Sequence, residues 1–200
     1  NNFVGTIGNA GCFSFYPTKN LGAYGDAGMI ITKEKSIANK IKKIRNYGEK
    51  EKNKNEIFGV NSRLDELQAA ILNVKIKYLD IWIEKRKKIA SYYDDNLKSS
   101  KIETPVLSAK SNHSYHLYVV KISNRNLIKK KLAEKGISTS IHYPLPIHLQ
   151  EAFSYLGYKK NQFPNSELLS QNSLSLPMYP ELTKDEINII CKNLIQLIED

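Results

Sequence analysis

The sequence predicts an α/β chain in two pieces: part of a larger mixed-sheet domain, followed by a small α+β unit. Short apolar runs typical of strands alternate with segments whose apolar residues recur at helical spacing. The first 60 residues hold two such strands and one helix, too few to bury both faces of a sheet. After one long helical segment the pattern becomes that of a separate α+β unit. We therefore expect residues 1–80 to be a remnant of a large domain and residues 81–200 to continue the long helix into a small domain.

The first piece begins with two strands joined by a glycine-rich loop. Residues 12–15 are predicted to form a buried strand and residues 29–32 the next strand, with Pro17 breaking the chain between them. Isoleucines at helical spacing between residues 37 and 44 predict a short helix. Residues 47–59 are polar and rich in Lys, Asn and Glu. We expect a mobile loop there.

A long helix is predicted to follow and to continue to about residue 97. Ser62 and Asp65 resemble a capping box, with Asp in place of the usual Glu. A bend or break is expected near Trp82. The predicted buried face is a single apolar stripe formed by Leu64, Leu67, Ile71, Val74 and Tyr78.

The second piece has the elements of a small α+β unit. Residues 115–122 are predicted as a strand, residues 127–135 as a helix ended by Gly136, and residues 137–142 as an exposed, alternating strand. A capping box then opens the last helix. Its cap residues and buried stripe are Thr183, Glu186, Ile187, Ile190, Leu194 and Leu197.

Composition excludes several classes of protein. With 41% hydrophobic and 25% charged residues the chain is ordinary globular material, and no apolar run reaches the roughly 18 residues of a membrane span. Two cysteines, Cys12 and Cys191, are too few for a disulfide scaffold. No Cys/His cluster has zinc-ligand spacing, so no metal site is predicted. The first residues lack the features of a signal peptide and resemble the middle of a longer chain. The cytoplasm is the expected compartment.

The formal net charge is +10 and comes mainly from lysine. Such a charge is compatible with nucleic acid, with an anionic substrate or with no specific partner. The lysines lie in short runs between apolar residues of predicted helices, as in residues 40–43 and 129–131. We interpret them as solvated helix faces in a Lys-rich composition.

The residues with chemical content surround Lys19. This lysine follows a predicted buried strand, between Pro17 and a glycine loop, and Ser14 lies five residues before it. A lysine near a low-dielectric core is favoured in its neutral form, which is a nucleophile toward aldehydes. Ser14 can donate a hydrogen bond to a phosphate oxygen, and glycines let the backbone pass close to a flat cofactor. The alternative is a surface lysine in a glycine-rich turn.

The stretch Gly11-Cys-Phe-Ser-Phe-Tyr-Pro-Thr-Lys19-Asn-Leu-Gly22 resembles the lysine signature of the DegT-type sugar aminotransferases, the DegT/DnrJ/StrS group. The resemblance implies a fold-type-I enzyme of about twice this length that depends on pyridoxal 5′-phosphate (PLP), with this chain as its C-terminal half. Further motifs agree in order: Arg45-Asn-Tyr-Gly48, Asn61-Ser-Arg-Leu-Asp-Glu-Leu-Gln-Ala-Ala70, Tyr115-His-Leu-Tyr118, His142-Tyr-Pro-Leu-Pro-Ile-His148 and Leu174-Ser-Leu-Pro-Met-Tyr-Pro180.

The resemblance also implies roles for the cofactor-binding residues. Lys19 would be the catalytic lysine that forms the Schiff base with PLP, and Ser14 would bind the cofactor phosphate. Asn61 would reach that phosphate from the neighbouring subunit, which implies a homodimer with shared active sites. The alternative for Asn61 is a residue at a helix end, preceding the predicted cap at Ser62.

Three more residues are candidates for substrate binding. Tyr47 lies beside the expected mobile loop, where family members place a residue near the substrate. His142 and His148 flank two prolines in a rigid loop. These histidines line a substrate pocket or belong to a loop that only packs between domains.

The reaction that the resemblance implies is amino transfer from an amino acid, glutamate, to a keto group of a nucleotide-linked sugar, in aminosugar or polysaccharide biosynthesis. The family's acidic partner of the pyridine nitrogen precedes the lysine by more than the 18 residues present here, so the chain alone should be inactive. Some relatives are PLP-dependent sugar dehydratases in which the lysine is replaced, and Lys19 argues against that class. A regulatory or nucleic-acid-binding protein is the other alternative, without a recognition-helix pattern to support it.

Overall fold

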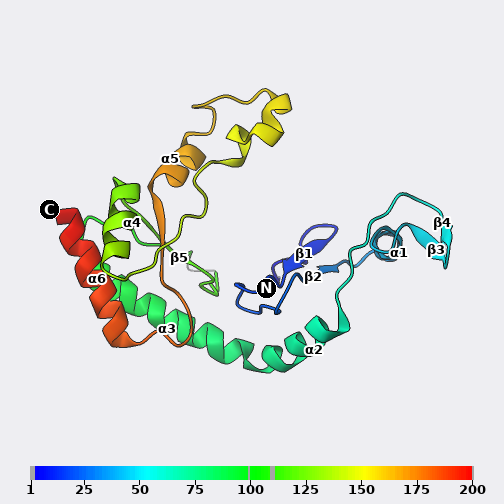
Figure 1. Cartoon of the computed structure of the whole chain (residues 1–200), viewed down its shortest axis with the longest axis horizontal. Helices are drawn as coiled ribbons and strands as arrows, with labels where there is room; N and C mark the ends of the chain where they lie inside the picture. Colours follow the sequence, from blue (N-terminus) through cyan, green and yellow to red (C-terminus); the bar gives the residue numbers. More distant parts are fainter. Residues whose placement is uncertain (1–2, 99, 109–110, 200) are drawn as a thin grey trace. The chain divides into compact units, whose positions relative to one another are not determined.

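The chain divides into two compact units, Asn1–Asp80 and Ile81–Asp200, each mixing strands with helices. Figure 1 follows the chain through these elements in a computed structural model that describes residues 3–98, 100–108 and 111–199. Within the described residues no helix is both long and apolar enough to cross a membrane.

The first unit is built on a two-stranded antiparallel sheet of β1 (Gly11–Ser14) and β2 (Gly28–Ile31). Both strands were expected, but the predicted burial of the first strand is wrong, because Cys12 is exposed. The second strand is also open to solvent: the side chains of Met29 and Ile30 in β2 are 46% and 48% exposed. The physical reason is that a sheet of only two strands is too small to be buried on both faces.

The expected short helix is present as α1 (Lys35–Ile44). The expected mobile loop is instead a hairpin of β3 (Glu49–Glu51) and β4 (Lys54–Asn55). Two glycines close its base. A Cβ on Gly48 would lie 1.6 Å from the carbonyl oxygen of Ile57, and one on Gly59 would lie 2.1 Å from the amide nitrogen of Gly48. Because the two backbones approach this closely, the polar segment pairs with itself.

The long helix is interrupted earlier than expected. It consists of α2 (Glu66–Lys75), a 3-10 turn η1 (Ile76–Tyr78) and α3 (Leu79–Leu97). The break therefore lies before Trp82.

The predicted start and buried face of the long helix are also wrong. Asp65, and not Ser62, is the N-cap, and it makes no side-chain cap bond. The predicted capping box does not form, because the Ser62 amide donates to the Arg45 carbonyl at 2.9 Å. In the predicted stripe, Leu67 is 70% exposed, whereas the buried residue of α2 is Leu72, at 7%.

The second unit has a hydrophobic core on one side of a two-stranded sheet. Strand β5 (Tyr118–Lys121) pairs antiparallel with β6 (Ser173–Leu176). Helices α3, α4 (Arg125–Glu134) and α6 (Lys184–Glu199) supply most of the remaining core. The rings of Tyr93 and Tyr118 stack in it with centroids 4.7 Å apart. The largest fully buried side chains are Tyr93, Tyr118, Leu97, Leu132, Leu174, Ile187 and Leu194.

Local predictions in the second unit are largely confirmed. The Thr183 hydroxyl donates to the Glu186 carboxylate at 2.7 Å, and the Glu186 amide donates back to the hydroxyl at 3.3 Å. Gly136 ends α4 with φ +76°. Three of the four residues in the predicted α6 stripe are buried, and Leu197 packs partly buried against the core.

Two features of the second unit differ from the prediction. Residues 137–140 alternate between buried and exposed as expected, whereas Ile141 and His142 are both half-buried. Among residues 137–142 only Ser140 pairs with a neighbour, in a single bridge to Ser175. Residues 143–163, called the arm below, carry two 3-10 turns, η2 (Ile147–Leu149) and η3 (Glu151–Leu156). The arm leads into α5 (Pro164–Asn172), which runs directly into β6.

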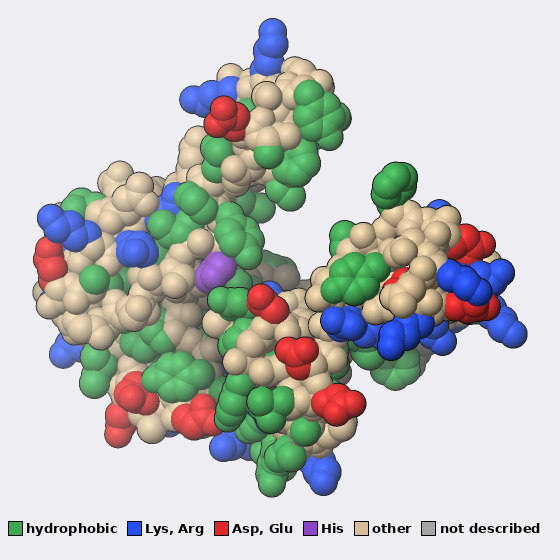
Figure 2. Space-filling view, turned by 45° about the vertical axis from the view of Figure 1, so that its right-hand side comes forward, with side chains coloured by type: hydrophobic (Ala, Val, Ile, Leu, Met, Phe, Trp, Pro, Cys, Tyr) green, Lys and Arg blue, Asp and Glu red, His purple; other side chains and the backbone are tan. Residues whose placement is uncertain are grey.

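Charged side chains lie on several parts of the face drawn in Figure 2. On the face in Figure 2, Lys and Arg side chains lie on several parts of the chain, among acidic and apolar ones. A nucleic-acid footprint is usually one basic stripe or patch. The visible face has no such single patch.

Candidate functional site

Lys19 lies in a closed turn between β1 and β2. We call residues 15–27 the lysine turn. The Phe15 amide donates to the Ala27 carbonyl at 2.9 Å, and the Ala23 amide donates to the Phe15 carbonyl at 2.8 Å. These bonds fix the two ends of the turn to the strand pair. Lys19, between them, is half-buried.

The glycine three residues after Lys19 is required by close backbone contact. A Cβ on Gly22 would lie 2.3 Å from the carbonyl oxygen of Pro17, closer than any side chain tolerates. The Lys19 amide donates to the Tyr16 carbonyl at 2.9 Å. The chain therefore folds back on itself around Lys19, and only glycine fits at position 22.

Ser14 is the last residue of β1, opposite Gly28. Its side chain is exposed, and its hydroxyl oxygen accepts a hydrogen bond from the Tyr16 amide at 3.3 Å. A hydroxyl that accepts through its oxygen can still donate its hydrogen. Ser14 and Lys19 thus lie on one continuous stretch, with an amine and a hydroxyl donor available.

Helix α2 holds the lysine turn from outside. The Gln68 side-chain oxygen accepts from the Tyr24 amide at 2.8 Å. The Lys75 ammonium donates to the Gly22 carbonyl and lies 5.1 Å from the centroid of the Tyr24 ring. Sequence reasoning missed both helix residues. Gln68 lies within a motif that carried the family resemblance, which was a usable signal, whereas Lys75 had none.

Asn61 and Tyr47 lie on adjacent backbone segments. Asn61 forms a bridge with Asn46, and the Tyr47 amide donates to the Val60 carbonyl at 3.1 Å. Asn61 is exposed and lies ahead of α2, which begins at Glu66, so it is not a helix-end residue.

Tyr47 has an unusual backbone and a cationic neighbour. Its φ is +56°, and its side chain is 45% exposed. The Arg63 guanidinium lies 5.8 Å from the centroid of its ring. Sequence reasoning did not single out Arg63, although it lies in the motif that begins at Asn61.

The two candidate histidines belong to the second unit and have different partners. The His142 Nδ1 atom lies 2.8 Å from the Ser175 hydroxyl oxygen, which ties the residue to β6. The His148 Nε2 atom lies 3.2 Å from a Glu167 carboxylate oxygen. The His148 ring also lies 4.8 Å from that of Phe163, centroid to centroid.

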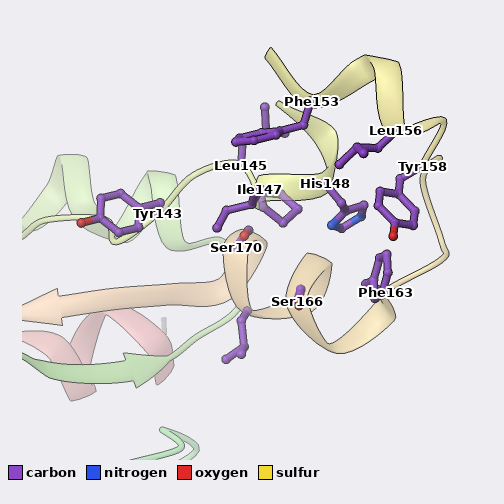
Figure 3. Close-up of a pocket in the computed structure, with 12 residues that line it drawn as sticks. Tyr143, Leu145, Ile147, His148, Phe153, Leu156, Tyr158, Phe163, Ser166 and Ser170 are labelled. Carbon is purple, nitrogen blue, oxygen red and sulfur yellow. The ribbon is translucent and has the colours of Figure 1, made fainter. Parts of the chain in front are cut away.

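The arm and α5 line an open apolar cavity of about 440 Å³. Figure 3 shows His148 in its wall, beside Leu156, Tyr158 and Phe163. The buried Glu167 carboxylate accepts from the Asn161 amide at 2.8 Å. This backbone bond, more than the contact with His148, lowers the pKa of Glu167. The cavity therefore combines apolar walls with an imidazole held by a carboxylate.

Acidification should loosen the arm. Because the pKa of Glu167 is lowered from 4.5 in the folded chain, its stabilising effect is complete above that ordinary value and is lost as the pH falls through the folded-state value. We expect hydrogen exchange at the Asn161 and Phe163 amides, corrected for its intrinsic rate, to increase below pH 4.5. Glu167→Gln should remove this pH dependence. An unchanged pH profile in that variant would assign the effect to another group.

Among residues 3–98, 100–108 and 111–199, no three His, Cys, Asp or Glu side chains gather where they could hold a metal ion.

Comparisons with known proteins identify the family of this chain. The chain is 43% identical to a "Pleiotropic regulatory protein" of Geobacillus stearothermophilus, covering 96% of this chain and 53% of the relative. It is 44% identical to a dTDP-3-amino-3,6-dideoxy-alpha-D-galactopyranose transaminase of Aneurinibacillus thermoaerophilus, covering 92% and 50%. The chain thus spans about half the length of the curated relatives it matches.

A solved structure shares the fold of this chain. NtdA of Bacillus subtilis with bound cofactor PMP superposes with a TM-score of 0.87 at 33% identity, covering 98% of this chain and 47% of NtdA. The predicted fold class, an α/β part of a PLP-dependent transferase, is confirmed. The model of the DegT/DnrJ/EryC1/StrS aminotransferase family matches residues 1–195, and the chain therefore belongs to that family.

Proposed function

We propose that the complete protein is a PLP-dependent aminotransferase. It moves an amino group from an amino acid, glutamate, to a keto group of a nucleotide-linked sugar, in aminosugar or polysaccharide biosynthesis in the cytoplasm. The observation that carries this proposal is the lysine turn, which sets Lys19 five residues after the Ser14 hydroxyl in a chain of an aminotransferase family.

The residues of the lysine turn fit the cofactor. PLP offers an aldehyde to an amine and a phosphate to hydrogen-bond donors. The turn presents the Lys19 amine, and the end of β1 just before it presents the exposed Ser14 hydroxyl. Gly22, where a Cβ has no room, keeps this stretch compact. Lys19 would hold the cofactor covalently and Ser14 would donate to its phosphate.

Asn61 would serve the neighbouring subunit of a homodimer. Its side chain is exposed, on a segment fixed by the bridge to Asn46, so it is available to a second chain. Donation of its amide to the partner's cofactor phosphate would complete each active site from two chains.

The chemistry divides between the cofactor and the lysine. When bound, PLP supplies an electron sink for the carbon that carries the amino group. The Nζ of Lys19 would take a proton from that carbon and return one later, as general base and acid. Both half-reactions, with the amino acid and with the ketosugar, need this proton transfer.

The same proposal assigns substrate-binding roles to three other residues. Tyr47 would contact the sugar substrate from beside the β3–β4 hairpin, where its ring is exposed. His142 and His148 would line the substrate pocket with their imidazoles. The net charge of +10 favours an anionic substrate, such as a nucleotide-linked sugar, over a neutral substrate.

An amino-transfer assay on the complete protein tests the proposal. The protein is incubated with PLP, glutamate and dTDP- or UDP-linked ketosugars, and the aminosugar product is identified by mass spectrometry. We expect formation of product and of 2-oxoglutarate in equal amounts. Product without PLP, or none with any ketosugar while PLP is bound, would contradict it.

Asn61→Ala should weaken cofactor retention without unfolding the protein. Loss of one hydrogen bond to a charged group costs roughly 1.5–3 kcal/mol, so the dissociation constant for PLP should rise about 10- to 150-fold. Equilibrium dialysis of the complete dimer measures it, with Asn39→Ala on α1 as a surface control. Unchanged affinity would remove Asn61 from the phosphate site.

A regulatory function is the second candidate, because one similar relative is named a pleiotropic regulatory protein. The simplest regulatory function of this kind is binding to nucleic acid. Salt-dependent DNA binding at physiological ionic strength, measured by fluorescence anisotropy, would favour it. A dehydratase is disfavoured because Lys19 is present.

A further inference from the structure

We propose that Gln68 and Lys75 are positioning residues for Lys19: together they fix the lysine turn from helix α2. This inference rests on the proposed function, because it assigns the pair to the reaction of Lys19. In this role neither residue touches the cofactor or the substrate. They act through the backbone that carries the lysine.

The two residues form one surface of α2. They are seven positions apart, which is close to two helical turns, so their side chains leave the same face of the helix. Both reach the same short segment of the turn, residues 22–25. Gln68 binds the Tyr24 amide, and Lys75 binds the Gly22 carbonyl.

The contacts from α2 reach the part of the lysine turn that contains Gly25. Two hydrogen bonds of Phe15 fix Ala23 and Ala27, which lie on either side of this glycine. Gly25 itself has broader conformational freedom than any other residue type. A Cβ on Gly25 would lie 3.3 Å from the Gln68 side-chain nitrogen, so the helix residue packs directly against this glycine.

Lys75 contributes through its charge as well as its reach. Its half-buried ammonium interacts with a carbonyl dipole and with the face of the Tyr24 ring, and both contacts favour a cation. Arginine can make the same two contacts, whereas methionine fills a similar volume without either. The pair Lys75→Arg and Lys75→Met therefore separates the charge from the bulk.

The contact with Gly22 places the consequence near Lys19. Gly22 packs against Pro17, and Lys19 lies between these two residues in the chain. A displaced Gly22 therefore changes the path of the backbone on either side of the lysine. Since a reacting amine must be held within a fraction of an ångström of its target to react efficiently, the Lys19 amine should bond to PLP less completely when the contact is lost.

The first arm of the test needs no cofactor. Hydrogen exchange is measured at individual amides of the complete protein without PLP, in Gln68→Leu, Lys75→Met and Lys75→Arg. Lys77→Met is the matched control because Lys77 is an exposed residue two positions along the chain. We expect exchange at the Tyr24 amide to increase on the order of tenfold in Gln68→Leu and several-fold in Lys75→Met, as for loss of about one hydrogen bond. Lys75→Arg and Lys77→Met should match the parent. Unchanged exchange at Tyr24 in both Gln68→Leu and Lys75→Met would overturn the proposal.

The second arm reads the lysine itself. The same variants are saturated with PLP and reduced with borohydride for a fixed time, and the fraction of chains labelled at Lys19 is measured by peptide mapping. We expect this fraction to fall several-fold in Lys75→Met and to return in Lys75→Arg. A looser turn with full labelling at Lys19 would overturn the positioning role and leave the proposed function intact. Absence of label on the parent protein would instead contradict the proposed function, while the exchange data would still report on the contact.

Discussion

Lys19→Ala should abolish both the visible absorbance of bound cofactor and amino transfer in the complete protein. Lys19 would supply both the covalent link to the cofactor and the proton transfer. Loss of a general acid–base group alone typically costs 10²- to 10⁴-fold in rate. Loss of the covalent link adds to that.

Borohydride reduction followed by peptide mapping measures this prediction directly. The label should fall on the peptide that contains Lys19 and should be missing in the variant. Lys33→Ala, an exposed lysine beyond β2, provides a control that should keep the label, the absorbance and the activity. Label on a different lysine in the parent protein would contradict the assignment.

The isolated 200-residue chain should associate in solution, or its first 60 residues should be loosely ordered, and it should bind PLP poorly. The first unit contains an open hollow of about 750 Å³ lined largely by apolar side chains of β1, β2 and α1. Met29 and Ile30 are each nearly half exposed there. At about 25 cal/mol per Å² of apolar surface, several such side chains represent many kcal/mol of unmet burial.

The second unit provides the internal comparison, because it has a continuous core. Size-exclusion chromatography with a PLP titration, combined with hydrogen exchange, measures the outcome. We expect amides of β1 and β2 to exchange faster than those of β5 and β6, and cofactor binding to recover when the rest of the polypeptide is supplied. A stable monomer that binds PLP with one-to-one stoichiometry would contradict the prediction.

Local signals in the sequence predicted much of the second unit. The capping box of Thr183 and Glu186 and the stop at Gly136 depend on residues within one helical turn. Such features form wherever the chain is placed. The lysine signature likewise placed Ser14 and Lys19 close together, because both belong to a single short stretch of chain: Ser14 ends β1, and Lys19 lies in the turn that follows.

Features that depend on distant residues could not be predicted in the same way. The segment 49–55 resembled a loop because its pairing depends on the close approach of Gly48 and Gly59, on either side of it. The partners of Gln68 and Lys75 lie 44 and 53 residues away. The stripe containing Leu67 followed the helical period, yet its burial depends on packing partners, which periodicity does not supply.

The closed base of the β3–β4 hairpin also separates the path of the main chain from the residues at the hairpin tip. Gly48 and Gly59 meet backbone to backbone, so the path of the chain toward Asn61 is fixed below the hairpin and does not depend on its tip. Residues can be added, removed or recoded at the exposed Lys52-Asn53 tip without shifting Asn61 or the start of α2. This makes the tip a practical place for inserting an epitope or a fluorophore.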